Sequence, residues 1–434
     1  MKKLALLLLL AVGCREATTT APRALAPVEA TDLDPAADTV RVLLTASRLA
    51  DGSDFLYAYN GTNPGPTIRA NVGDLLVVDL VNDLDTATTI HWHGVAVPFD
   101  MDGVTWMRDP VGPGETFTYQ FRLTQAGTFF YHPHFDTESQ VEGGLYGALV
   151  VHDPADPVPD VDIVLIADVA DELSPMQHAH GHGRRAVRWR VNGVEDAELS
   201  VDGGSTVRAR FVNASNVGIL ALSAPGMLHI ASDQGLLPGA QSPQRLILGP
   251  GDRADVELSV GEDDFAIQTA PYSLNGGEQW GDPVDLVRIV VDNPAPAPAP
   301  LAWPFPGGVV SDDPGYADIV YALAGSDRSR VWMINGERFP NVTIETIPFG
   351  QVAIVDVVNL SPSQHPFHIH GLEFEVLAVN GVPPPYRTIE DTFHLRIRDR
   401  VRLRIDADNP GDWMTHCHIL PHAGDGMMTV LRVD

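Results

Sequence analysis

Three repeated segments constrain what this chain of 434 residues can fold into. Each copy begins with Asn-Gly and leads to a run of β-branched residues that ends in Asn, over residues 60–82, 192–213 and 335–359. Asn-Gly is typical of tight turns, and short β-branched runs separated by Gly, Pro, Asn and Asp are typical of β-sandwiches. Because each repeat is expected to form one unit, we predict an all-β chain of three consecutive Greek-key β-sandwiches without a long amphipathic helix.

Composition places the boundaries between these units. Residues 153–159 and 293–310 are rich in Pro, Ala and Asp, and the second stretch alternates Pro with Ala, which predicts a stiff, extended spacer. We therefore predict a first domain over residues 39–153, a second over 160–292, a linker over 293–310 and a third domain over 311–434.

The first residues predict export. Met1-Lys2-Lys3 and an apolar run to Val12 are typical of a signal peptide. This run is much shorter than the roughly 20 residues that cross a bilayer. Gly13-Cys14 resembles the lipobox of bacterial lipoproteins, and simple cleavage nearby is the alternative. We therefore expect a signal peptide over residues 1–14, a flexible tether over 15–38 and a periplasmic or cell-envelope protein that is anchored to a membrane by a lipid on Cys14.

Charge and cysteine usage narrow the possible partners. The chain has 28 Lys and Arg against 57 Asp and Glu, a formal charge of −29, which argues against nucleic-acid binding. The charge also attracts cations, although solubility explains it equally well. Only two cysteines occur, so that Cys417 has no disulfide partner once Cys14 belongs to the leader. Stability is therefore expected to come from packing and bound metal.

Cys417 stands between two histidines, His416 and His418. A strand directs alternate side chains to opposite faces, so both imidazoles point one way and the thiol points the other way. One short segment can thus serve two metal centres. Thiolate, imidazole and a weak axial thioether form the ligand set of a blue-copper electron-transfer site. The ligands that Cys417 can recruit on its side are His365, His422 and Met427.

Three further His-x-His pairs follow the same alternation, and they are His91 with His93, His132 with His134, and His368 with His370. With His416 and His418 they make eight imidazoles, enough for a three-copper cluster. A single such pair is weak evidence, whereas four pairs are not a coincidence of composition. The middle repeat has Gln268-Thr269-Ala270 at this position and is predicted to bind no metal. The cluster is therefore expected at the interface between the first and third units.

These four segments resemble the copper-binding signatures of the multicopper oxidases, a family that includes laccases, cuproxidases, ferroxidases and bilirubin oxidases. The resemblance covers nearly all of the chain after the leader and implies that each unit is a cupredoxin domain. It implies four copper ions. The implied ligands are His365, Cys417, His422 and axial Met427 for type 1, His91 and His368 for type 2, and two sets for type 3 (His93, His132, His418; His134, His370, His416).

The resemblance also implies a reaction. A small reducing substrate gives single electrons to the type 1 site, and Cys417 with His416 or His418 passes them to the cluster, where dioxygen becomes two waters. Asp102 matches an acidic residue that assists the cluster in the family, although a turn aspartate is the alternative. Many relatives carry a glutamate near the last signature, where this chain has Ala423, and Asp425 is a possible substitute. The axial methionine implies a low to moderate potential.

The substrate is less constrained by sequence. Only nine methionines occur, and no Met-rich insert lies near the copper site of the third unit, which favours a laccase-like oxidase of phenols or aromatic amines. We expect the protein to be a monomer. One alternative is a metallo-oxidase of Cu(I), Fe(II) or Mn(II) for metal tolerance, which the acidic composition and the His-rich stretch Met176–His182 support. A non-catalytic copper-storage lipoprotein is the other, and the complete ligand set argues against a member that has lost its metals. We interpret His152, His229 and His394 as structural.

Overall fold

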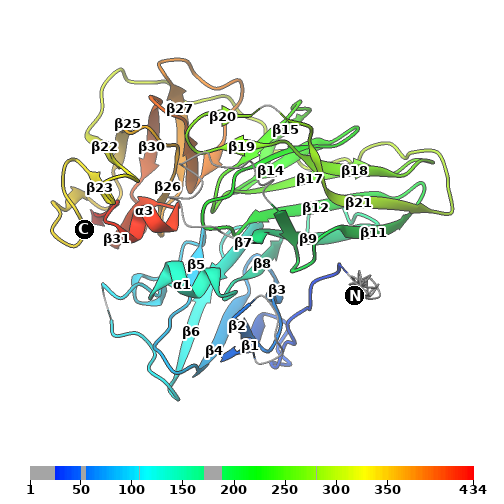
Figure 1. Ribbon diagram of the computed structural model, residues 1–434, viewed down its shortest axis with the longest axis horizontal. Coiled ribbons are helices and arrows are strands. Elements are labelled where there is room, and N and C mark those ends of the chain that lie inside the picture. The colour runs from blue at the N-terminus through cyan, green and yellow to red at the C-terminus, as the bar shows by residue number, and fades with distance from the viewer. Residues whose placement is uncertain (1–24, 50–54, 107, 171–187, 280) are drawn as a thin grey trace, which may run out of the picture.

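The computed structural model describes residues 25–49, 55–106, 108–170, 188–279 and 281–434. These residues form seven sheets, arranged as three pairs and one small hairpin (Figure 1). The helices among them are short, with α1 over Thr137–Glu142, α3 over Leu420–Gly424 and the 3-10 helix η1 over Phe99–Met101. The predicted all-β class is confirmed.

The first sheet pair has four strands in each sheet. One sheet runs β2 (Tyr57–Tyr59), β1 (Thr39–Arg48), β4 (Leu75–Asp83) and β6 (Thr116–Arg122). The other runs β3 (Gly65–Asn71), β8 (Gly147–His152), β7 (Gly127–His132) and β5 (His91–His93).

The second pair contains larger sheets. One runs β10 (Arg188–Val191), β9 (Val161–Ala170), β12 (Thr206–Asn213), β17 (Arg253–Ser259), β14 (Leu228–Ser232) and β15 (Gly235–Gln241). The other runs β11 (Ala197–Asp202), β21 (Val284–Asp292), β18 (Phe265–Thr269), β13 (Leu220–Ser223) and β16 (Leu246–Leu248). The hairpin of β19 (Tyr272–Ser273) and β20 (Gly277–Glu278) lies beside them.

The third pair is built in the same way. One sheet runs β23 (Val331–Ile334), β22 (Ile319–Ser326), β25 (Val352–Asn359), β30 (Arg400–Asp406), β27 (Phe374–Val379) and β28 (Ile389–Glu390). The other runs β24 (Glu345–Ile347), β32 (Met428–Val433), β31 (Gly411–Cys417), β26 (His365–Ile369) and β29 (Thr392–Leu395).

The repeated Asn-Gly pairs do the same work in each unit. Asn60, Asn192 and Asn335 adopt φ angles of 52°, 50° and 54°, which short polar side chains tolerate better than branched ones. Each asparagine amide donates to one carbonyl and accepts from one backbone N–H of the unit's first long strand, β1, β9 or β22. That strand then pairs in parallel with β4, β12 or β25. The repeat therefore encodes the turn that sets the register of each unit.

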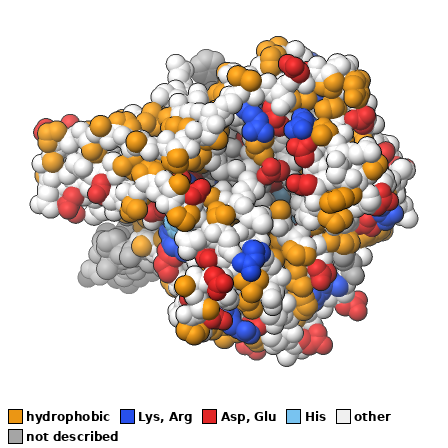
Figure 2. Space-filling view, turned by 180° about the vertical axis from the view of Figure 1, so that it is seen from behind, with side chains coloured by type: hydrophobic (Ala, Val, Ile, Leu, Met, Phe, Trp, Pro, Cys, Tyr) orange, Lys and Arg blue, Asp and Glu red, His pale blue; other side chains and the backbone are white. Residues whose placement is uncertain are grey.

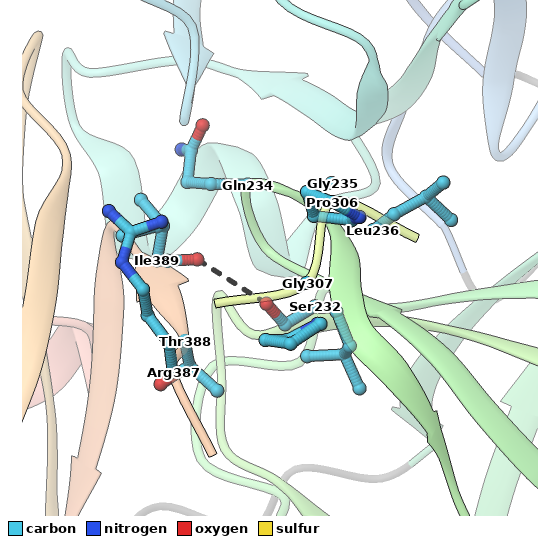
Figure 3. Close-up of a pocket in the computed structure, with 11 residues that line it drawn as sticks. Ser232, Gln234, Gly235, Leu236, Pro306, Gly307, Arg387, Thr388 and Ile389 are labelled. Atoms are coloured by element: carbon cyan, nitrogen blue, oxygen red, sulfur yellow. Dashed lines mark hydrogen bonds between the residues drawn. The ribbon is translucent and has the colours of Figure 1, made fainter. Parts of the chain in front are cut away.

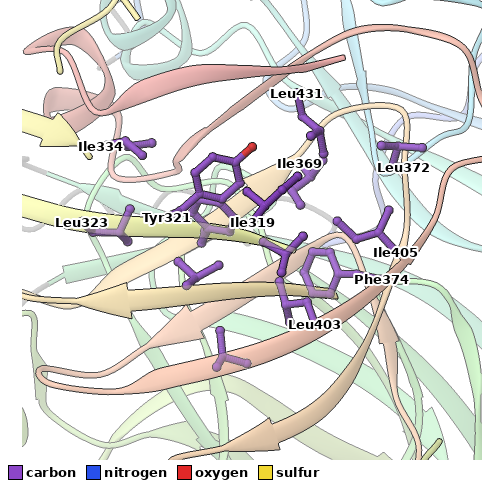
Figure 4. Close-up of a cluster of buried hydrophobic side chains, with 14 of the residues drawn as sticks. Ile319, Tyr321, Leu323, Ile334, Ile369, Leu372, Phe374, Leu403, Ile405 and Leu431 are labelled. Carbon is purple, nitrogen blue, oxygen red and sulfur yellow. The ribbon is translucent and has the colours of Figure 1, made fainter. Parts of the chain in front are cut away.

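Each sheet pair encloses its own hydrophobic core. In the third unit the side chains from facing sheets interdigitate around Tyr321, Phe374 and Leu403 (Figure 4). A fourth, smaller cluster joins the units, since Phe130 of β7, Val164 of β9 and Leu420 of α3 belong to it. Apolar packing thus holds all three units against one another, next to the ends of β5, β7 and β31.

The predicted flexible tether over residues 15–38 does not hold for its described part. Leu25 is buried in the second unit's core and its carbonyl accepts a hydrogen bond from Asn192 Nδ2. Ala30 N donates to Thr67 O of β3. A single buried leucine in a Pro- and Ala-rich stretch leaves no periodic signal, which is why the sequence did not indicate this contact.

Other sequence predictions stay as they were. Cys14, the signal peptide and the His-rich stretch 176–182 lie outside the described residues. The linker over 293–310 contains no strand or helix, and Trp303 Nε1 in it donates to Glu257 of β17. Within the described ranges, no helix is long and apolar enough to cross a membrane. The visible face in Figure 2 carries acidic, basic and hydrophobic side chains interspersed.

The core assignment predicts the effect of truncating Leu403, which is fully buried. We expect Leu403→Ala to lower the free energy of unfolding by about 2–5 kcal/mol, because the removed methyl groups leave a cavity. The control Val320→Ala changes a side chain that is 48% exposed, and we expect it to cost less than about 1 kcal/mol. Denaturant unfolding of the copper-free protein measures both, and equal costs would contradict the assignment.

Candidate metal centres

Four strands bring the eight histidines of the His-x-His pairs together. β5 pairs with β7 so that His91 lies opposite His132, and β26 pairs with β31 so that His368 lies opposite His416. The other four each lie two residues further along the chain, and they are His93, His134, His370 and His418. The two faces meet because the first and third units pack against each other, so the cluster lies between domains that are distant in sequence.

The ring nitrogens form three groups in which all ligand atoms lie within 4.8 Å of one another. Two of them have the same members as the sets that the resemblance implies for type 3 copper (His93, His132, His418; His134, His370, His416). The third joins the implied type 2 pair, His91 and His368, to His93. Histidine rings of the first and third units also stack on each other across the interface. The ring centroids are 3.8 Å apart for His91 with His370 and for His93 with His368.

The histidines in this cluster present unpaired nitrogens to one another. His91, His132 and His368 each have a buried Nε2 without a hydrogen-bond partner, while their Nδ1 atoms contact Asp102, Pro133 O and Asp391 O. A buried polar atom without a partner is costly unless something else, such as a metal, satisfies it. Metal-binding histidines characteristically bond outward through their second nitrogen. The residues therefore fit copper, which accepts imidazole ligands readily.

Burial also keeps these imidazoles in the neutral form that binds metal. Burial lowers the pKa of His416 to about 3, with a further contribution from His368. Burial and neighbouring imidazoles lower the pKa of His132, His134 and His418 well below the ordinary value. Adjacent imidazoles that carry no charge do not repel one another in this small space.

Asp102 lies at one side of the cluster and is 1% exposed. Its carboxylate oxygens are 3.1 Å from His91 Nδ1 and 2.8 Å from His370 Nδ1, so it accepts from one histidine of each copper-binding unit. The neighbouring Gly103 has φ +78°, and a Cβ there would lie 1.8 Å from Ile90 O. The alternative interpretation of Asp102 as a turn aspartate therefore describes its backbone. It does not account for the side chain, which contacts two histidines of the cluster.

Asp391 makes the equivalent contacts on the other side, and the sequence did not indicate it. It is fully buried, and its Oδ1 lies 3.0 Å from His93 Nε2 and 3.3 Å from His368 Nδ1. Burial alone would raise the pKa of Asp391, but Arg253 and the two histidines outweigh burial and hold this pKa well below the ordinary value. An aspartate in Glu390-Asp391-Thr392 has no spacing that relates it to a histidine pair, which is why no pattern revealed it.

The second centre lies on the opposite face of β31. Cys417 Sγ is 3.3 Å from His365 Nδ1 and 3.8 Å from His422 Nδ1, and all three residues are buried. The short helix α3 returns the chain so that Cys417 N donates to Met427 O. Burial raises the pKa of the Cys417 thiol, which a bound metal would overcome by binding the thiolate. Thiolate, two imidazoles and a nearby methionine fit a blue-copper site.

The surroundings of this centre distinguish its two histidines. His365 Nε2 lies 2.6 Å from Ser361 Oγ, which is buried. His422 Nε2 lies 3.3 Å from Asp327 Oδ1, and the Asp327 side chain is 18% exposed. The Trp332 ring covers His422 with centroids 3.8 Å apart. His422 is therefore the ligand candidate whose outer edge has the shortest polar connection to the surface.

Several other candidates belong to none of the metal-sized groups among the described residues. Asp425 forms an ion pair with Arg330 at 3.3 Å and caps the end of α3, and a role in proton supply stays a prediction. In the second unit, Gln268 bonds Asp285 and Thr269 bonds Ala221 N. Among the described residues, none of the metal-sized groups includes His152, His229 or His394.

Comparison with known proteins agrees with this geometry. Two family models, each described as multicopper oxidase, match residues 44–156 and 313–434. The multicopper oxidase mco of Staphylococcus aureus is 30% identical over 397 residues, covering 86% of this chain and 83% of that protein. The multicopper oxidase MmcO of Mycobacterium tuberculosis is 27% identical over 429 residues, covering 86% and 82%.

Solved structures are similar over nearly the whole chain. A multicopper oxidase from Campylobacter jejuni, titled a metallo-oxidase, superposes with a TM-score of 0.79 at 26% identity and 94% coverage of both chains. The laccase-like multicopper oxidase CueO from Ochrobactrum sp. gives a TM-score of 0.80 at 25% identity, covering 94% of this chain and all of that one.

The buried histidines predict a pH effect that is separable from metal binding. Burial lowers the pKa of His394 from 6.5 to about 4. Between these values the unfolded chain binds more protons than the folded chain, so the folded state loses stability as the pH falls. In copper-free protein, we expect the free energy of unfolding of His394→Gln relative to wild type to rise by about 2 kcal/mol from pH 7 to pH 5. Denaturant unfolding tests this, and a difference that does not change with pH would contradict it.

Proposed function

Because this chain belongs to the multicopper oxidase family, we propose that it is a laccase-like oxidase that couples four one-electron oxidations of a phenol or an aromatic amine to the reduction of dioxygen to two waters. One observation supports this most directly. A thiolate centre and an eight-histidine centre share the strand β31, with Cys417 on one face and His416 on the other. A storage protein would not require two different centres joined by one residue.

The ligand roles follow the groups that the structure brings together. Copper supplies the redox chemistry when bound, accepting single electrons at the thiolate centre and reducing dioxygen at the histidine centre. The residues proposed to hold it are those named for the resemblance: His365, Cys417, His422 and Met427 for type 1, His91 and His368 for type 2, and the two three-histidine groups for type 3. All of the histidines and the cysteine among them are found in the groups described above.

The protein's contribution is a covalent electron path and a dry, oriented site. From the Cys417 sulfur, the backbone of β31 leads directly to the imidazoles of His416 and His418. His416 Nδ1 also lies 3.0 Å from Cys417 O, which shortens the connection and fixes the ring. Burial of both centres excludes water from the imidazole nitrogens. Asp102 orients His91 and His370, because its carboxylate accepts a hydrogen bond from the Nδ1–H of each ring.

Electrons are proposed to enter at the outer edge of His422. This edge contacts Asp327, an acid whose side chain is 18% exposed. Few methionines occur in the whole chain, nine in all, and this scarcity supports an organic donor over Cu(I). The laccase-like Ochrobactrum protein is described as an oxidase of lignin model compounds, which is consistent with a phenolic substrate.

A metallo-oxidase is the second candidate, and Asp327 favours it. A carboxylate beside the electron-entry imidazole attracts a metal cation and gives no comparable advantage to a neutral phenol. The Campylobacter relative is described as a metallo-oxidase. The chain's formal charge of −29 acts in the same direction by raising the local concentration of cations.

Oxygen uptake by copper-loaded protein that begins after Cys14 tests both candidates. We expect uptake with a phenol, together with the intense visible absorption of a copper–thiolate bond. Cys417→Ser should remove this absorption and reduce uptake with every donor to background, because no thiolate then connects the two centres. Uptake with Cu(I) alone would replace the laccase-like proposal by the metallo-oxidase. Visible absorption without uptake on either donor would overturn the enzymatic assignment of the histidine centre.

The role of Asp327 can be measured separately. We expect Asp327→Asn to lower kcat/KM for Cu(I) about tenfold and to leave kcat/KM for a neutral phenol within about twofold, because only the cation is attracted by the lost charge. Asp412→Asn is a matched control, since that side chain is 20% exposed, is paired with Arg432 and has no bond to His422. Equal losses for both donors would show that Asp327 acts on the site's structure and not on the approach of a cation.

A further inference from the structure

Arg253 is a fully buried side chain at the point where the three units meet. Its guanidinium has five N–H donors, and each has an acceptor. Nε donates to Thr128 O of the first unit at 3.1 Å. The terminal nitrogens donate to Gly251 O and Asp233 O within the second unit and to both carboxylate oxygens of Asp391 in the third. One residue of the second unit thus bonds to all three units.

Asp391 connects this guanidinium to the histidine centre. On its other side it contacts His93 of the first unit and His368 of the third, as described above. Thr392 Oγ1 donates to Asp391 Oδ1 at 2.9 Å and also lies 3.1 Å from His93 Nε2. The Nδ1 of His93 is left buried without a partner, and His93 belongs to two of the metal-sized groups.

Two glycines, Gly94 of the first unit and Gly251 of the second, let the units approach one another closely beside the cluster. A Cβ on Gly94 would lie 2.3 Å from Arg253 Nη2 and 2.6 Å from Asp391 Oδ2. A Cβ on Gly251 would lie 2.9 Å from the His418 ring and 3.1 Å from the His93 ring. Both glycines also have positive φ, a conformation that favours glycine. The absence of a Cβ at these two positions leaves room for the ion pair and the imidazoles.

Further bonds between the second and third units hold the two partners in register. Figure 3 shows the Ser232 hydroxyl bonded to Ile389 O, beside Gln234. Asp233 N donates to Glu390, Gln234 Nε2 donates to Asp391 Oδ2, and Thr392 N donates to Asp233 Oδ2. The turn between β14 and β15 therefore lies beside the segment that joins β28 to β29, and successive residues of the two segments are hydrogen-bonded to each other.

We propose that Arg253 and Asp391 are positioning residues through which the second unit, whose described residues belong to none of the metal-sized groups, fixes His93 and His368 in the geometry that the histidine centre requires. This inference rests on the copper assignment and is independent of the electron donor. The bidentate pairing explains why arginine is required, since its planar fork matches a carboxylate and a lysine ammonium does not. Asp391 and Asp102 then act as a pair, each holding one histidine from the first unit and one from the third.

The test compares copper binding by purified, copper-loaded variants. Loss of a bonding partner behind a ligand histidine typically weakens metal affinity about 10- to 100-fold. We expect Asp391→Asn and Arg253→Lys to weaken copper retention at the histidine centre by that factor against a chelator. We also expect an altered electron paramagnetic resonance spectrum of the type 2 copper. The copper–thiolate absorption should persist, because Cys417 and its partners do not contact the pair.

Arg210→Lys is the matched control. Arg210 is equally buried and also bonds across units, to Thr128 Oγ1, Asp162 and Asp255, but it contacts no cluster histidine. We expect it to lose stability while copper content and spectrum stay as in the wild type. Gln234→Leu removes one bond to Asp391 and keeps the ion pair, so it should show a smaller effect of the same kind and serves if Asp391→Asn does not fold.

The proposal is overturned if Arg253→Lys and Gln234→Leu retain wild-type copper affinity and an unchanged type 2 spectrum. It is also overturned if Arg253→Lys and Arg210→Lys change both measurements equally, because the ion pair would then be merely structural. Copper retention is measured on each folded variant, so these outcomes can be distinguished without measuring oxidase activity.

Discussion

The structure depends on keeping eight imidazoles close together inside the protein. Most of these rings bond to protein through one nitrogen and present the other to the shared space, whereas both nitrogens of His418 are buried without a partner. A buried nitrogen without a partner is costly unless a metal binds it. His91 and His368 bond outward to Asp102 and to the backbone of Asp391. The sheet pairs supply the rigid walls: the strands carry the rings, and the carboxylates fix their rotation.

The second unit contacts the histidine centre although its described residues belong to none of the metal-sized groups. Its β17 carries Arg253, and the turn before this strand brings Gly251 against the rings of His93 and His418. Arg253 and Asp391 form a buried ion pair. Substitution of either residue leaves the charge of the other uncompensated inside the protein, so each residue is needed as long as the other is present. The described part of this unit therefore forms a third wall of the histidine centre.

Cys417 gives the two centres a fixed relation. Strand alternation sends its sulfur into the third unit's core and its neighbours toward the cluster, so the distance between the centres is set by one residue's covalent geometry. The donor side is less tightly defined. The Asp327 carboxylate lies 3.3 Å from His422 Nε2, and the Trp332 ring covers the His422 ring.

The sequence by itself determined the all-β class, the three repeats, the pairing of histidines on strand faces and the role of Cys417 between two centres. These follow from local rules, namely the two-residue alternation of a strand and the turn preference of Asn-Gly. Asp391, Arg253 and the packing of Leu25 were decided only by the tertiary structure. Arg253 and Asp391 bond to each other although more than a hundred residues separate them in the chain. Such a contact depends on how whole sheets pack, and no local sequence pattern records this packing.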